Sequence, residues 1–186
     1  MRCMKKIWVR ILAVAAVLVA VSACSKEELA GRVEFDAEWA AAYFLGTDGA
    51  SAVGNYQLAL VQGRTDEDFA LISSGAVLCL RLSAPVADGI QLPDGTYRGF
   101  DGREAAFTFD RGEMQADNTV SGSYVGIRPV ASNPMQYYPI GEGEASVAFG
   151  RNGSYVIEVR VKAEDRSFVF TYGGPVETFD CTGPKL

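Results

Sequence analysis

The stretch S-Y-V-I-E-V-R-V-K, residues Ser154 to Lys162, decides the fold class. Its apolar side chains occupy every second position, and charged side chains fill the positions between them toward the end of the run. Successive side chains of a β-strand point to opposite faces, so the alternation predicts a strand with one buried and one solvated face. Asn152-Gly153 precedes it, the pair typical of a type I′ hairpin turn. The apolar set is Tyr155, Ile157, Val159 and Val161.

The segments on either side of this stretch repeat the same period. Ala145, Val147 and Phe149 alternate before the turn, and Phe168, Phe170 and Tyr172 alternate after a polar turn at residues 164–167. Residues 144–172 therefore predict a three-stranded antiparallel meander.

Upstream segments carry the same signal in shorter form. Alternating apolar residues occur at 56–60, 78–82 and 107–109, a proline-glycine turn opens a strand near residue 96, and residues 120–127 read as a strand with two glycines. Residues 36–46 fit either an alanine-rich helix or a strand, and we favour the strand because every second residue from Val33 to Leu45 is apolar or alanine. No helical pattern separates the strands, which excludes a parallel βαβ architecture.

About nine short strands divided by turn signals predict an all-β fold. We expect an antiparallel β-sandwich, with an up-and-down, lipocalin-like barrel as the alternative. Residues 32–186 are expected to form a single β domain that ends in a short C-terminal tail.

The N-terminal segment has the pattern of a signal peptide. Residues 1–10 carry four basic side chains, and the apolar core at residues 11–21 is shorter than the roughly 20 residues that span a bilayer. Val21-Ser22-Ala23-Cys24 resembles the bacterial lipobox. The resemblance implies that residues 1–23 are removed and that Cys24 receives palmitate-type acyl chains, which anchor the protein to the outer membrane. The alternative is an ordinary secretory peptide in which Cys24 is incidental.

Residues 24–31 read as a charged tether. Lys26, Glu27 and Glu28 resemble the export signal of Bacteroides-type surface lipoproteins, which implies a location on the outside of the cell. The alternative is that these charges only solvate the linker and that the domain faces the periplasm.

The composition bounds the partners. The chain has 17 basic and 23 acidic residues, and loss of residues 1–23 leaves 13 basic against 23 acidic, a net charge of −10. This balance disfavours nucleic acid as a partner and leaves the acyl chains as the contact with the lipid bilayer. The chain has no histidine, which excludes His-dependent catalytic arrangements and His metal sites. We predict no metal, cofactor or catalytic residue, and hence no enzyme.

Tyr137 and Tyr138 are the leading candidates for ligand binding. They lie between Pro134 and Pro139 in an expected connection, where flat aromatic faces suit a sugar ring or a protein partner. The alternative is that they are strand neighbours pointing to opposite faces. Acidic groups at residues 66–68 and 110–117 are expected to be solvated loops, and Trp39 is expected to lie in the core.

Two cysteines remain in the processed chain, Cys79 and Cys181, and in an oxidising compartment they could pair. The alternative places Cys79 as a small apolar side chain and Cys181 as a free thiol in the tail.

The whole β region also carries a resemblance. The order A-A-Y-F-L-G, G-N-Y-Q-L-A-L, L-P-D-G-T-Y, G-E-A-S-V-A-F-G-R-N-G-S-Y-V-I-E-V and F-V-F-T-Y-G-G, from Ala41 to Gly174, resembles an uncharacterised β domain of Bacteroides-type surface lipoproteins. That resemblance implies no activity. We expect a binding module for a glycan or a protein, and the alternative is a structural or adhesive component of a cell-envelope assembly. The ligand and the oligomeric state stay open.

Overall fold

The computed structural model describes residues 31–47, 52–66, 70–86, 90–100 and 105–183. The chain divides into one unit that ends at Arg32 and a second that runs from Val33 to Leu186. The second unit carries the fold. The expected signal peptide, Cys24 and the charges at Lys26, Glu27 and Glu28 lie outside the described residues.

The fold is all-β, as predicted. None of the described residues forms a helix, and hence none forms a helix long and apolar enough to cross a membrane. The described residues form fourteen strands, more than the nine expected, because several are only two to five residues long. The strands are β1 (Arg32–Asp36), β2 (Trp39–Thr47), β3 (Val53–Gln62), β4 (Gly75–Pro85), β5 (Gly95–Phe100), β6 (Thr108–Asp110), β7 (Glu113–Met114), β8 (Val120–Ser121), β9 (Tyr124–Arg128), β10 (Gln136–Pro139), β11 (Glu142–Phe149), β12 (Tyr155–Ala163), β13 (Arg166–Gly174) and β14 (Val176–Asp180).

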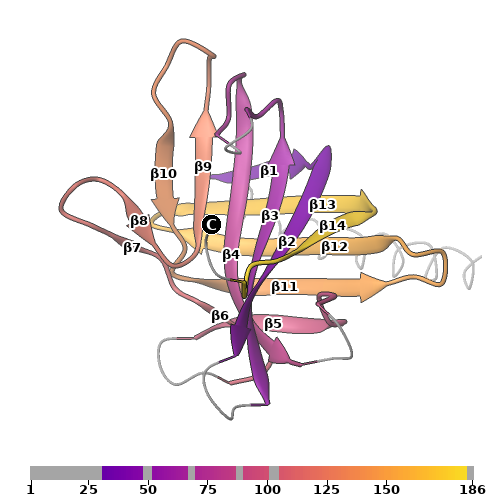
Figure 1. The fold of residues 1–186 in the computed structure, drawn as a ribbon. Coiled ribbons are helices and arrows are strands. Elements are labelled where there is room, and N and C mark those ends of the chain that lie inside the picture. The colour runs from indigo at the N-terminus through magenta and orange to yellow at the C-terminus, as the bar shows by residue number, and fades with distance from the viewer. Residues whose placement is uncertain (1–30, 48–51, 67–69, 87–89, 101–104, 184–186) are drawn as a thin grey trace, which may run out of the picture. The chain divides into compact units, whose positions relative to one another are not determined.

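Twelve of these strands belong to one sheet. Ten follow the order β1-β13-β12-β11-β5-β6-β4-β3-β2-β14, with β9 and β10 branching from β4, while β7 and β8 form a separate small ribbon. The sheet is strongly curled into a half-barrel, so that β11, β12 and β13 run across the direction of β2, β3 and β4 (Figure 1). The expected division into two sheets of a sandwich is not confirmed.

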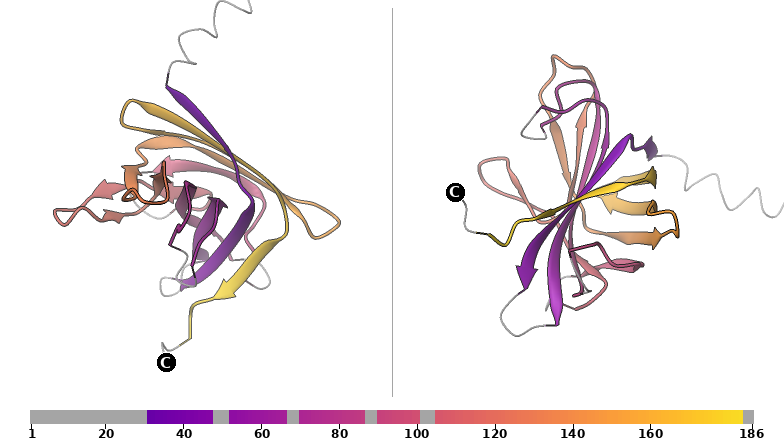
Figure 2. Two further views of the ribbon diagram at one scale, coloured as in Figure 1. Left: turned by 90° about the horizontal axis from the view of Figure 1, so that it is seen from above. Right: turned by 45° about the vertical axis from the view of Figure 1, so that its right-hand side comes forward.

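The prediction of purely antiparallel pairing is wrong for two pairs, since β14 pairs in parallel with β2 and β5 pairs in parallel with β6. The parallel pairing of β14 with β2 follows from the paths of two long segments that bend at the same place. The segments β1–β2 and β13–β14 each continue through a bend, and the Ala37 N–H donates to the Thr171 carbonyl where they meet, at 2.8 Å. Figure 2 shows the indigo and yellow strands lying side by side through this bend.

The main core lies on the inner side of the curl. Two predictions are wrong: Phe149 is 39% exposed, and in β2 the residues that join the main core are Ala40 and Ala42, not the predicted alternating set that includes Trp39 and Tyr43. The other alternating residues predicted to point inward mostly do so, and the largest of them are fully buried. This set includes Tyr56, Leu58, Leu60, Leu78, Leu80, Leu82, Phe109, Ile157, Val159, Phe168 and Phe170.

The meander is confirmed as β11, β12 and β13, which pair antiparallel in sequence. Its first turn is not of type I′, because Gly153 has a φ of +79° while Asn152 does not have a positive φ. The Gly153 N–H donates to the Gly150 carbonyl at 3.1 Å, and the Gly150 N–H donates to the Ser154 carbonyl at 2.7 Å. The loop is therefore one residue longer than the predicted turn and ends in a single left-handed glycine.

Residues 36–46 follow the strand prediction. They lie mostly in β2, whose pairing with β3 is interrupted by an irregularity between Phe44 and Gly46. The helical alternative is wrong, because burial of one face against the core outweighs the helix propensity of alanine.

The prediction that Phe179 and Asp180 belong to a tail beyond the last strand is also wrong. Residues 176–180 form β14, and the Cys181 N–H donates to the Phe44 carbonyl at 2.9 Å. Two glycines end β13 and Pro175 follows them, so the local sequence indicates that the last strand ends there. The hydrogen bonds that order β14 come from β2, which lies more than 130 residues earlier in the chain.

Candidate functional site

The sheet divides into two branches at strand β4, and we call this division the fork. One edge of β4 pairs with β3 along its full length, but the other edge is shared: Gly75–Cys79 pair with β9, and Leu82 and Ser83 pair with β6. Arg81 lies between the two partners. Its backbone N–H donates instead to the Ser123 hydroxyl at 3.0 Å, and Ser123 is fully buried. The fork therefore places Arg81 at a gap between two diverging strands.

Two segments cross closely beside this gap. The Gly112 N–H donates to the Ile140 carbonyl at 2.8 Å, and the Ile140 N–H donates to the Ser123 carbonyl at 3.0 Å. Gly122 has a φ of +75°, and a Cβ added there would lie 2.0 Å from the Arg111 carbonyl oxygen. The absence of a side chain at Gly122 thus lets the end of β8 pass against the end of β6.

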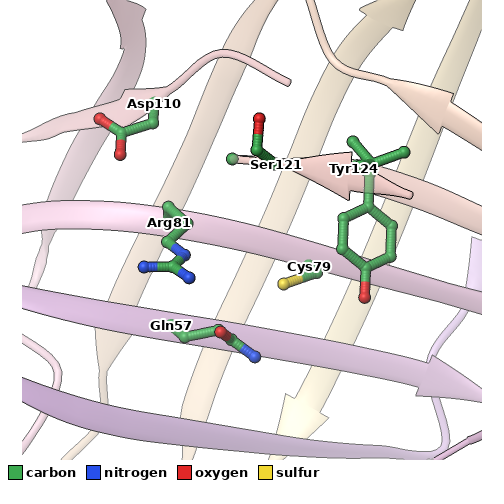
Figure 3. A pocket seen from close by; sticks show the side chains of 8 residues that line it. Gln57, Cys79, Arg81, Asp110, Ser121 and Tyr124 are labelled. Carbon is green, nitrogen blue, oxygen red and sulfur yellow. The ribbon is translucent and has the colours of Figure 1, made fainter. Parts of the chain in front are cut away.

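The crossing leaves a hollow of about 310 Å³ over β3 and β4, which we call the first hollow. Figure 3 shows Arg81 in the view between Asp110 and Gln57, with Cys79 and Tyr124 to one side. A second hollow of about 320 Å³ shares Gln57, Cys79 and Tyr124 with the first and extends toward β2 and the end of β14. Each volume lies at the lower end of the range for ligand pockets, about 300–1,000 Å³. The first hollow is lined by Gln57, Cys79, Arg81, Asp110, Val120, Ser121, Gly122 and Tyr124, and the second adds Tyr43, Leu45, Ala59, Val77 and Cys181.

The two hollows together form a groove, here called the outer groove, on the face of the sheet opposite the main core. The middle of the groove is lined by small side chains, because Ala59 on β3 and Cys79 on β4 are direct register partners there. Larger side chains stand on either side: Tyr124 pairs with Cys79 from β9, and Tyr43 on β2 pairs with Gln57. Small residues between aromatic ones give the groove its depth.

Two aromatic pairs flank the second hollow, and each contributes one ring, Tyr43 or Tyr124, to its lining. The rings of Tyr43 and Phe179 are stacked, with centroids 5.1 Å apart and planes 14° apart. The rings of Tyr124 and Tyr137 meet edge to face, with centroids 5.5 Å apart and planes 78° apart. Phe179 and Tyr137 are 38% and 39% exposed, so each pair presents a ring to solvent.

The first hollow contains one basic and one acidic side chain. Across the residues described, the guanidinium of Arg81 and the carboxylate of Asp110 make no ion pair and no side-chain hydrogen bond, although both line the same hollow. Elsewhere on the sheet, three cations pair with glutamates: Arg98 with Glu144, Arg160 with Glu158, and Lys162 with Glu142. The first hollow thus offers one cation and one anion for an external group.

The thiol in the groove is protonated at neutral pH. Burial raises the pKa of Cys79 to about 11, against the smaller lowering effects of Arg81 and of the hydrogen bond from Tyr124. Burial also raises the pKa of Tyr124, and it raises that of Tyr43 to about 12. Because the thiolate is the nucleophile, a protonated Cys79 is chemically inert near pH 7.

Cys79 and Cys181 are both free, with Cys79 buried and Cys181 exposed. The structure therefore has no disulfide between Cys79 and Cys181. The physical reason is that β3 and β2 lie between β4 and β14 in the sheet, and three spacings of about 4.8 Å exceed the roughly 7 Å that a disulfide allows between Cα atoms. Both side chains nevertheless line the second hollow.

We predict that iodoacetamide at pH 8 labels Cys181 of the native protein and spares Cys79. Cys181 is exposed, whereas Cys79 is buried and its raised pKa keeps it protonated at this pH. After unfolding in guanidinium chloride without reductant, both should be labelled completely. Peptide mass spectrometry measures each site, and incomplete labelling of both cysteines after unfolding would mean that a bridge forms.

Tyr137 and Tyr138, the predicted ligand-binding residues, do not share one site. Tyr137 and Tyr138 lie in β10 rather than in a connection, and they point to opposite faces, as the strand alternative predicts. Tyr137 contacts Tyr124 at the outer groove. Tyr138 lies against Phe168 at 5.5 Å between centroids, with the Arg166 guanidinium carbon 5.0 Å from its ring centre. Only Tyr137 therefore lies beside the site, through its contact with the lining residue Tyr124.

The structure also places Trp39 and part of the acidic groups considered in the sequence. Trp39 is half-buried and packs against a second apolar cluster of Val61, Leu71 and Val77. Of the acidic groups, Asp110 borders the first hollow, Glu67 and Asp68 fall outside the described residues, and the described part of the chain contains no group of three or more metal-ligating side chains.

Sequence reasoning missed Gln57, Arg81 and Tyr124. One signal was present: Cys79 and Arg81 interrupt the run A-V-L-C-L-R-L of β4, on the face away from the alternating leucines.

No protein-family model, curated protein or solved structure matches this chain.

Proposed function

We propose that this protein is a lipid-anchored, non-catalytic binding module of a bacterial outer membrane that faces the cell exterior and holds a glycan in its outer groove. The observation that carries the proposal is a groove in which two aromatic pairs, Phe179 beside Tyr43 and Tyr137 beside Tyr124, flank the second hollow while polar side chains line the adjoining first hollow.

The groove has the chemistry that sugars need. Aromatic faces and edges pack on the apolar C–H surfaces of a sugar ring, and tyrosine provides this area with little loss of side-chain entropy. Gln57, with an amide that both donates and accepts hydrogen bonds, lines the first hollow together with the charged Arg81 and Asp110 and the ring of Tyr124. Such mixed donors and acceptors match hydroxyl groups, which also both donate and accept.

The lining of the first hollow supports binding rather than hydrolysis. Glycoside hydrolysis normally uses two carboxyl groups about 5–9.5 Å apart. Asp110 is the single carboxylate among the residues that line the first hollow, and the second hollow adds none. Cys79 is buried and its raised pKa disfavours the thiolate, which makes it a weak nucleophile.

The location rests on the N-terminal sequence. Cys24 is proposed to carry the acyl anchor, and Lys26, Glu27 and Glu28 to direct the protein outward. The processed chain has a net charge of −10, which favours a domain that stays clear of its own anionic bilayer.

A second candidate is a structural or adhesive component of an envelope assembly. It is favoured by β10, which pairs with β9 alone among the described strands and so presents an open edge. An open edge offers backbone donors and acceptors to a strand of another protein.

We expect Phe179→Ala and Tyr137→Ala each to weaken glycan binding about tenfold, which corresponds to loss of about 1.4 kcal/mol of ring contact. The measurement is a glycan array followed by calorimetry with the best oligosaccharide, using the whole protein in detergent. Phe149→Ala is the matched control, since Phe149 is also 39% exposed but its ring contacts Tyr155, which lines neither hollow, whereas Phe179 and Tyr137 contact the lining residues Tyr43 and Tyr124. An equal loss in the Phe149 variant, or no bound glycan at all with the wild type, would contradict the proposal.

A further inference from the structure

The position of Arg81 is fixed by its backbone. Its N–H is held by the buried Ser123 hydroxyl at 3.0 Å, and its Cα pairs with that of Gln57 across β3 and β4. Alternation along β4 puts its side chain on the face opposite Leu80 and Leu82, where it lines the first hollow (Figure 3). The guanidinium is therefore presented from a rigid strand rather than from a loop.

The surroundings of Arg81 lack a counter-charge in contact with it. Through the described ranges no carboxylate lies within ion-pair distance of its guanidinium, in a processed chain that has ten more acidic than basic residues. The planar guanidinium presents two parallel donors that match a carboxylate. A carboxylate on the ligand would therefore pair with the guanidinium of Arg81 in the first hollow.

Asp110 restricts what else the ligand can carry. An ionised carboxylate only accepts hydrogen bonds, so Asp110 requires donors such as hydroxyl groups. It also repels further negative charge, as does the acidic protein as a whole. The hollow thus favours a unit with one carboxylate and several hydroxyls over a polysulfated or phosphorylated chain.

We infer that the first hollow binds an acidic sugar residue of the uronic-acid type, with its carboxylate on Arg81 and its hydroxyls donating to Asp110. Gln57 lies beside Arg81 and bonds a further hydroxyl, while Tyr124 contacts the ring. This inference rests on the proposed glycan-binding function and names the class of glycan.

The test compares two tetrasaccharides of equal length, one containing glucuronic acid and one containing glucose in its place. Binding to the whole protein in detergent is measured by calorimetry at 50 mM and 500 mM salt. The wild type should bind the acidic tetrasaccharide at least tenfold more tightly at 50 mM salt, and most of this preference should disappear at 500 mM.

Arg81→Gln should abolish the preference while leaving binding of the neutral tetrasaccharide within about twofold, and Arg81→Lys should retain part of it because the charge remains without the planar fork. The matched control is Arg160→Gln, since Arg160 is an exposed arginine paired with Glu158 on β12, outside the groove lining, and should change neither affinity. Thermal unfolding of each variant checks that the fold is kept.

Equal affinity for the two tetrasaccharides would overturn the inference and leave glycan binding in place. Binding of neither would overturn both. Equal losses in the Arg81→Gln and Arg160→Gln proteins would show non-specific attraction and also overturn the assignment. Tighter binding of a zwitterionic amino acid than of the acidic tetrasaccharide would assign the hollow to a different ligand.

Discussion

Replacement of Cys24 by alanine is expected to move nearly all of the protein from the membrane fraction to the soluble fraction. Each buried CH₂ of an acyl chain contributes about 0.8 kcal/mol, so several chains on one residue hold the protein almost permanently, and their loss removes the whole anchor. The domain should stay folded, because Cys24 lies outside the unit that carries the sheet.

The measurement is ultracentrifugation and immunoblotting of cells, with radiolabelled palmitate to follow acylation. Cys181→Ala provides the matched control, since it also removes a thiol but should leave both fractionation and labelling unchanged. Recovery of the Cys24 variant with membranes at the wild-type level would contradict the lipoprotein proposal.

Replacing Lys26, Glu27 and Glu28 with alanine should keep the anchor and change the side of the membrane. The variant should still sediment with membranes but should resist protease added to intact cells, whereas the wild type should be cleaved. Cleavage of both proteins to the same extent would show that these residues are only a tether.

Gly122→Ala is expected to lower the free energy of unfolding by about 2–5 kcal/mol. The left-handed conformation at Gly122 costs an alanine about 1–2 kcal/mol, and overpacking typically adds about 1–3 kcal/mol. The added Cβ would lie 2.0 Å from the Arg111 carbonyl oxygen, so the backbone of β6 or β8 must move. The same movement should displace Asp110 and Ser121 from the first hollow and weaken ligand binding.

Gly153→Ala separates the two contributions. Gly153 has a nearly equal φ of +79°, but an added Cβ there meets no atom within 4 Å. This variant should lose only the conformational contribution, about 1–2 kcal/mol. Urea unfolding of both proteins gives the difference, and equal losses would mean that the crossing at Gly122 has room for a side chain.

The strands that were predicted well are those whose own residues carry the information. In β12 the alternation of Tyr155, Ile157, Val159 and Val161 specifies both the strand and its buried face. In β2 the period indicated a strand despite the high alanine content, but the predicted core face was wrong, since Ala40 and Ala42 join the main core and Tyr43 lines the second hollow. The turn before β12 was predicted in position but not in type, since one additional residue changes the hydrogen-bond pattern without changing the flanking period.

The candidate site was predicted poorly because its residues are far apart in the chain. Tyr137 and Tyr138 were grouped for being adjacent in sequence, yet adjacency in a strand places side chains on opposite faces. Gln57, Arg81, Asp110 and Tyr124 come from four different strands, and each alone resembles an ordinary surface residue.

The local period of the side chains was sufficient to establish that this chain is all-β and which residues of most long strands turn toward the core; β2 is the exception, since Ala40 and Ala42 rather than Trp39 and Tyr43 join the main core. Hydrophobic burial acts on each strand separately, so this information is present in every short segment. The choice of neighbours was made only in the tertiary structure. Pairing of β14 with β2 and the fork at Arg81 depend on hydrogen bonds between distant segments, and alternation is the same whichever strand lies alongside. The outer groove exists because that choice placed small residues of β3 and β4 between aromatic residues of β2, β14, β9 and β10.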